Sequence, residues 1–138
     1  MNRRQLEHVL RAVGAITELD EFVVIGSQAI LGSHAEAPDE LLMSMEIDMY
    51  PLNDPGKADL VECIGEFSPF HDQFGYYAHG VGPETAKLPT GWQERLVTVA
   101  SEYTRGVKVQ CLSPADLAVS KLAAGRDKDV AFVASMLR

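Results

Sequence analysis

The sequence predicts a single α/β (α+β) domain in which helices flank a small mixed sheet. Its length of 138 residues is typical of one ordinary domain. Apolar residues recur at helical spacing near both ends, while segments between them show the patterns of β-strands. No internal repeat or linker divides the chain, so residues 1–138 are expected to form one domain. The helical pattern at the end leaves open that further C-terminal helices follow in a longer protein.

The first half of the chain alternates helical and strand patterns. Residues 3–19 carry one apolar helical stripe. Residues 22–25 are β-branched and aromatic, which predicts a buried strand, and residues 28–31 resemble the first turns of a helix. Residues 34–39 are expected to form a loop. Apolar and polar residues alternate strictly over residues 45–50, which predicts a half-buried strand that ends at a proline.

The middle of the chain is less regular. Residues 56–66 are expected to be helical, whereas residues 67–92, rich in aromatic residues, His and Gly, are predicted to be mostly irregular loop. Two further strands are predicted at residues 95–100 and 107–111.

The C-terminal segment begins with a clear helix start. Ser113 is a suitable N-cap and Pro114 suits the first helical position. We expect a helix to about residue 124, a break at Gly125, and a second helix from residue 127 to the end.

Composition and charge exclude several classes of protein. Twelve Lys and Arg against twenty Asp and Glu give a net charge of −8, which disfavours general binding to nucleic acid. Residues 121–138 are net positive, so a local anion pocket remains allowed. No apolar run approaches the ~20 residues that cross a bilayer, and no secretory signal is visible. Cys63 and Cys111 are then expected to be reduced thiols, and the protein to be cytoplasmic with no membrane partner.

The strand over residues 45–50 carries the most informative pair of residues. Glu46 and Asp48 project from the same strand face, with Cα atoms about 6.5–7 Å apart. Carboxylates at this spacing can converge on a hard cation such as Mg²⁺, which prefers oxygen ligands. An acidic strand face that simply points at solvent gives the same pattern. The context of the pair therefore decides between these readings.

A glycine-serine turn lies upstream of this pair. Gly26 and Ser27 end the buried strand and lead into the next predicted helix. Such a turn presents backbone N–H groups and a hydroxyl at the positive end of a helix dipole, where an anion can bind.

Together, Gly26-Ser27, Ser44 and Glu46-Ile47-Asp48 resemble the signature of the minimal nucleotidyltransferase (DNA polymerase beta-like) superfamily. The segment from Leu112 to Asp129 is similar to the second block of the abortive-infection-type nucleotidyltransferases, which are associated with bacterial toxin–antitoxin systems. In that block, a helix bearing a lysine (here Lys121) precedes an arginine turn and a Lys-Asp pair. The resemblance spans residues 22–50 and 107–137, with both blocks in the expected order.

The resemblance implies a nucleotidyltransferase-like fold that transfers a nucleotidyl group from an NTP with Mg²⁺. The implied acceptor is unidentified, with tRNA or a protein as candidates, and an antitoxin is a candidate partner. The implied catalytic residues are Glu46, Asp48 and Lys121, of which Glu46 and Asp48 would bind the metal. The implied nucleotide-binding residues are Gly26, Ser27, Ser44, Arg126 and Asp129.

The chain departs from the superfamily pattern in two ways. Its first acid is Glu46, where the superfamily more often has Asp. Active members also use a third carboxylate from a later strand, whereas the strands predicted at 95–100 and 107–111 carry no suitable acid. A degenerate fold that acts as a non-catalytic nucleotide- or protein-binding module is therefore the alternative.

The segment at 67–92 adds a second question. His71, Asp72 and His79 allow a zinc site, although no closely spaced His or Cys pair defines one. An ordered loop that is packed by its own aromatic residues and walls the site is the favoured interpretation.

Overall fold

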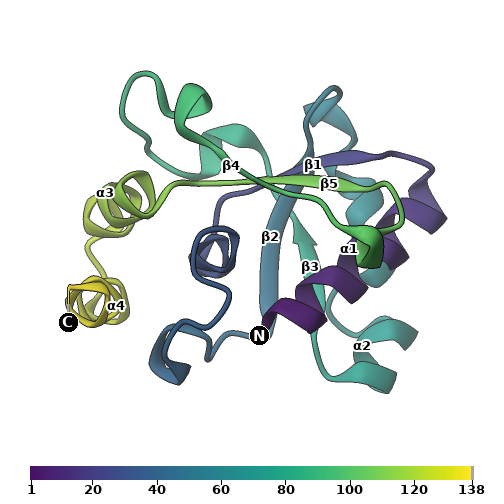
Figure 1. Ribbon diagram of the computed structural model, residues 1–138, viewed down its shortest axis with the longest axis horizontal. Helices are drawn as coiled ribbons and strands as arrows, with labels where there is room; N and C mark the ends of the chain where they lie inside the picture. Colours follow the sequence, from purple (N-terminus) through teal and green to yellow (C-terminus); the bar gives the residue numbers. More distant parts are fainter. Residues whose placement is uncertain (138) are drawn as a thin grey trace.

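The protein is built around a mixed β-sheet, as the computed structural model in Figure 1 shows. The structure describes residues 1–137. The sheet has five strands in the order β3-β2-β1-β5-β4. β1 pairs antiparallel with β2 and parallel with β5. β3 joins β2 in parallel, and β4 joins β5 antiparallel. The strands are β1 (Glu21–Val24), β2 (Glu46–Pro51), β3 (Tyr77–Gly80), β4 (Val97–Val99) and β5 (Lys108–Cys111).

The α-helices flank this sheet, as predicted. They are α1 (Arg3–Thr17), α2 (Pro69–Phe74), α3 (Pro114–Ala124) and α4 (Asp127–Met136). Figure 1 places α1 and α2 on one side of the view and α3 and α4 on the other. The predicted α/β class with a small mixed sheet is thereby confirmed.

The amphipathic first helix forms much of the core. Its N-cap Asn2 exchanges hydrogen bonds with Gln5 in a capping box, which satisfies two N–H groups at the helix start. Its buried stripe packs in the hydrophobic core with the buried residues of the strands. Ile16 lies in the last turn of the helix and is 57% exposed. The buried stripe residues are Leu6, Val9, Leu10 and Val13.

Two predicted helices form as 3₁₀ helices. η1 (Ser27–Gly32) follows β1, where residues 28–31 predicted the first turns of a helix, and η3 (Pro55–Ile64) replaces the helix predicted at 56–66. η3 is kinked at Lys57, whose dihedral angles are not helical. It contacts β2, β3 and α1. Tertiary packing therefore outweighs the weak helical periodicity of this segment. The other 3₁₀ turns are η2 (Asp39–Leu41), η4 (Pro83–Thr85), η5 (Trp92–Arg95) and η6 (Glu102–Thr104).

The prediction of a mostly irregular loop over residues 67–92 is wrong for the first half of this segment. Helix α2 begins after Ser68, whose hydroxyl accepts a hydrogen bond from the His71 N–H, and ends at Gly75. Strand β3 then extends the sheet beside β2. The pattern was hard to detect because β3 is a short edge strand with only Ala78 fully buried.

The C-terminal helix pair follows the predicted boundaries closely. Ser113 caps α3 by accepting a hydrogen bond from the Asp116 N–H at 3.3 Å, and the helix ends at Gly125. α3 packs on η1, the 3₁₀ helix that follows β1, and on α4, which in turn packs on η2. No helix within residues 1–137 is long and apolar enough to cross a membrane.

Candidate nucleotide-binding site

Strand β2 presents Glu46 and Asp48 on one face of the sheet. Ile47 and Met49 alternate with them and are fully buried on the other face. The Tyr77 hydroxyl donates a hydrogen bond of 2.8 Å to Glu46 Oε2 from the neighbouring strand. Glu46 is therefore oriented by β3.

The two carboxylates shift each other's pKa in opposite directions. Burial, together with the hydrogen bond and charge of Glu46, raises the pKa of Asp48 to about 7. The hydrogen bond from Asp48 in turn lowers the pKa of Glu46. Asp48 Oδ1 is buried and has no hydrogen-bond partner in the described part of the chain. A buried, unpartnered carboxylate oxygen is costly unless a ligand satisfies it.

The Gly26-Ser27 turn lies directly against Asp48. The Ile25 N–H donates to the Asp48 carbonyl at 3.1 Å, which ties the end of β1 to β2. A Cβ atom at Gly26 would overlap the Asp48 carboxylate, so glycine is needed for this close approach. Because the turn leads into a six-residue 3₁₀ helix, a helix dipole contributes less here than the sequence suggested.

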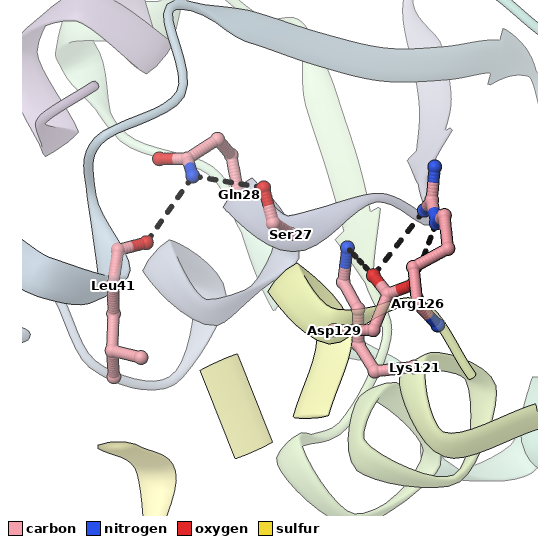
Figure 2. Close-up of polar contacts among 6 residues, drawn as sticks. All are labelled: Ser27, Gln28, Leu41, Lys121, Arg126 and Asp129. Atoms are coloured by element: carbon pink, nitrogen blue, oxygen red, sulfur yellow. Dashed lines mark hydrogen bonds and ion pairs between the residues drawn. The ribbon is translucent and has the colours of Figure 1, made fainter. Parts of the chain in front are cut away.

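Gln28 holds the Ser27 hydroxyl in place. Its side chain is 1% exposed, and its amide donates to Ser27 Oγ at 3.1 Å and to the Leu41 carbonyl at 3.3 Å (Figure 2). The Ser44 side chain also makes local hydrogen bonds. Its hydroxyl bonds the backbone N–H and carbonyl of Glu46 at 3.1 Å each and so fixes the start of β2.

Asp129 holds the two cations of the C-terminal helices. It is 1% exposed, and its carboxylate accepts hydrogen bonds from Arg126 at 2.6 and 3.2 Å. Lys121 Nζ lies 3.5 Å from the same carboxylate (Figure 2). It also lies 5.3 Å from the centre of the Phe132 ring. The hydrogen bonds from Arg126 lower the pKa of Asp129, so the anchor is ionised at neutral pH. Asp129 therefore sets the position of both cations.

Two cavities lie against this constellation. One of ≈ 340 Å³ lies between the Gly26 turn, Asp48 and the end of α3. The other, of ≈ 390 Å³, lies beside Glu46. Asp48, Lys121 and Arg126 line both cavities, so the two cations share these cavities with the buried acid of β2. Every predicted site residue lines at least one cavity: Gly26, Ser27, Ser44, Glu46, Asp48, Lys121, Arg126 and Asp129.

Sequence reasoning missed several lining residues. Tyr77 lines the second cavity from β3, and Lys128 lines it from α4. Lys87 lines the first cavity from the segment after η4. The alternation of Tyr77, Ala78 and His79 was the available signal for β3. Within residues 1–137, no three His, Cys, Asp or Glu side chains group closely enough to hold a metal ion by themselves, which includes the zinc candidates His71, Asp72 and His79.

A sheet with paired acids beside a glycine-serine turn, faced by helix-borne cations, defines a nucleotidyltransferase-like class of protein. The match to a known protein family agrees with this class. The chain belongs to the family described as nucleotidyltransferase of unknown function (DUF6036), which it matches over residues 4–137. No curated protein and no solved structure matches the chain. The resemblance to the minimal nucleotidyltransferase superfamily is thereby confirmed.

Proposed function

We propose that this protein transfers a nucleotidyl group from a Mg²⁺-bound NTP to a hydroxyl acceptor. The observation that carries the proposal is the Asp48 carboxylate. It is buried beside Glu46, leaves one oxygen without a partner and faces a cavity lined by Lys121 and Arg126. Oxygen ligands of this kind suit Mg²⁺, which commonly completes its shell with water and substrate phosphates.

The acidic and basic residues of the site have different proposed roles. Glu46 and Asp48 would hold the cation, which neutralises phosphate charge and activates the attacking hydroxyl when bound. Lys121 and Arg126 lie where they can bind phosphate oxygens, with Asp129 as their common anchor. The Gly26-Ser27 turn forms the wall beside Asp48, where the triphosphate would pass. The acceptor, whether tRNA or a protein, and an antitoxin partner stay predictions from the resemblance.

Thermal melting with and without ligands tests the proposal. Two acids alone should bind Mg²⁺ weakly, so we expect little shift with Mg²⁺ and a clear shift with Mg²⁺ plus an NTP. At a hundredfold excess over Kd, the stabilisation would be about 2.7 kcal/mol. Asp48→Asn should abolish the shift, whereas Asp59→Asn, an exposed acid on η3, should keep it. A melting temperature that no combination of Mg²⁺ and NTP moves contradicts the proposal.

The second candidate is a nucleotide-binding module without transfer activity. It is favoured by the small set of acids, because no group of three potential metal ligands occurs in residues 1–137. Formation of a nucleoside monophosphate and pyrophosphate from the bound NTP separates the candidates. Binding without any product would support the module.

A further inference from the structure

The proposed transfer needs a group that takes the proton of the acceptor hydroxyl. Glu46 and Asp48 are assigned to the cation, the Tyr77 hydroxyl already donates to Glu46, and Lys121 is paired with Asp129. We propose that His79, oriented by Glu62, accepts this proton. The inference rests on the proposed function and adds a catalytic residue to it.

The strand register places His79 beside the acidic pair. In the parallel pairing of β2 with β3, Asp48 lies opposite His79 and Glu46 lies opposite Tyr77. Residues opposite each other on strands about 4.8 Å apart project from the same face of the sheet. The His79 side chain is 49% exposed and therefore open to an acceptor.

Glu62 fixes the orientation and the proton of the ring. Its Oε1 atom lies 3.0 Å from His79 Nδ1 and accepts a second hydrogen bond of 2.9 Å from the Gly80 N–H. Because an ionised carboxylate can only accept, the neutral imidazole carries its proton on Nδ1. Nε2, on the side of the ring away from Glu62, then has a lone pair for the acceptor proton. A base held by a third group in this way is typical of acid–base catalysis.

The backbone around Gly80 makes this contact possible. A Cβ atom at Gly80 would overlap the carbonyl oxygen of Ala58, so η3 can approach β3 only because residue 80 is glycine. The close approach brings Glu62, on η3, to the edge of the sheet. The pair of Glu62 and His79 is therefore built by tertiary packing.

In the proposed step, His79 Nε2 takes the proton as the acceptor oxygen forms a bond to the α-phosphorus. The bond from that phosphorus to the bridging oxygen of pyrophosphate breaks, and pyrophosphate leaves with the electron pair. The proton on His79 then passes to solvent, which returns the neutral ring. When water is the acceptor, the same bonds form and break, and the products are the nucleoside monophosphate and pyrophosphate.

The test uses Mg²⁺, ATP and water as the acceptor, with AMP and pyrophosphate as products. His79→Gln should bind Mg²⁺–ATP like the wild type but form AMP about a hundredfold more slowly, or slower still. Imidazole added to His79→Ala should restore part of the rate, because it replaces the missing base. Glu62→Gln should slow AMP formation, and ¹⁵N NMR of its His79 ring should show a smaller population of the Nδ1-protonated form than in the wild type.

Two matched variants serve as controls. His34→Gln, an exposed histidine after η1, and Asp59→Asn, an exposed acid on η3, should keep the wild-type rate. A His79→Gln protein that forms AMP at the wild-type rate overturns the role of His79 and leaves the proposed transfer standing. A wild type that binds Mg²⁺–ATP without forming AMP overturns both and leaves only nucleotide binding. A wild type that does not bind Mg²⁺–ATP overturns the proposed function as well.

Discussion

Gly26 lies in direct contact with the carboxylate of Asp48. A Cβ atom at residue 26 would come within 3.0 Å of Asp48 Cγ and would overlap Oδ2. The φ angle of Gly26 is −83°, which any residue adopts. Space, rather than backbone conformation, therefore demands glycine here. The turn after β1 and the buried acid of β2 form one structural unit.

This contact predicts that Gly26→Ala is destabilising. The added methyl group must displace Asp48 or the turn, and overpacking of this kind costs about 1–3 kcal/mol. Urea denaturation should show the loss in the wild-type background and a smaller loss in an Asp48→Ala background, which lacks the overlapping carboxylate. Gly56→Ala is the control, because its Cβ meets only Asp54 Oδ1 at 3.7 Å. Equal losses in both backgrounds would contradict the explanation.

Asp48→Asn should stabilise the protein in the presence of a chelator. The folded-state pKa of Asp48 is about 7, above the ordinary value of about 3.9. Between these values the folded state binds more protons than the unfolded state, so the free energy of unfolding falls as pH rises. Asparagine does not titrate.

The stability advantage of Asp48→Asn should therefore grow from pH 4 to pH 7 and then level off, reaching at most about 4 kcal/mol. Chemical denaturation across this pH range measures it. Asp59→Asn should show no comparable trend. An Asp48→Asn protein that is less stable than the wild type at pH 8 would argue against a destabilising buried charge.

Lys121→Ala should weaken nucleotide binding and leave stability nearly unchanged. Loss of one charged contact to phosphate should lower the affinity for Mg²⁺–ATP about tenfold. Isothermal titration calorimetry measures the affinity and thermal melting the stability. Lys57→Ala is a matched control, because Lys57 forms an exposed ion pair with Asp54, with Nζ 3.5 Å from Oδ2. Equal affinities for Lys121→Ala and Lys57→Ala would refute the role of Lys121.

Asp129→Asn should behave differently from Lys121→Ala. Asp129 is buried and holds both Lys121 and Arg126. Removal of its charge leaves these cations without their common anchor, which should reduce both the melting temperature and the affinity for Mg²⁺–ATP. A variant that loses affinity while keeping its full stability would instead indicate direct contact between Asp129 and the nucleotide.

The carboxylate of Asp116 should contribute to stability above about pH 4. It accepts two hydrogen bonds of 2.9 Å from Arg95 and one of 2.9 Å from the Ser113 hydroxyl. The Arg95 hydrogen bonds lower the pKa of Asp116, so its contribution is present above the ordinary value of about 3.9. It is lost as pH falls through the folded-state pKa.

Asp116→Asn should accordingly melt at a lower temperature than the wild type at pH 7, with a smaller difference at pH 3. Thermal melting followed by circular dichroism measures both. Asp54→Asn, which removes an exposed ion pair with Lys57, is the control and should change little at either pH. A difference that is larger at pH 3 would contradict the assignment.

Local patterns in the sequence predicted much of the fold and the shared strand face of Glu46 and Asp48. Ser113 and Gly125 directly flank helix α3, as its N-cap and C-cap residues. The period of two along β2 predicted that Glu46 and Asp48 project from one face. These features follow from sterics and hydrogen bonds between near neighbours, which the sequence displays directly.

By itself the sequence determined the α/β class, the C-terminal helix boundaries and the shared face of Glu46 and Asp48. Only the tertiary structure decided that β3 lies beside β2, that η3 is a 3₁₀ helix, and that Lys121 lines the same cavity as Asp48. It also decided the pairing of His79 with Glu62. Such contacts join residues distant along the chain and depend on strand register and close backbone packing, which no short stretch of sequence encodes.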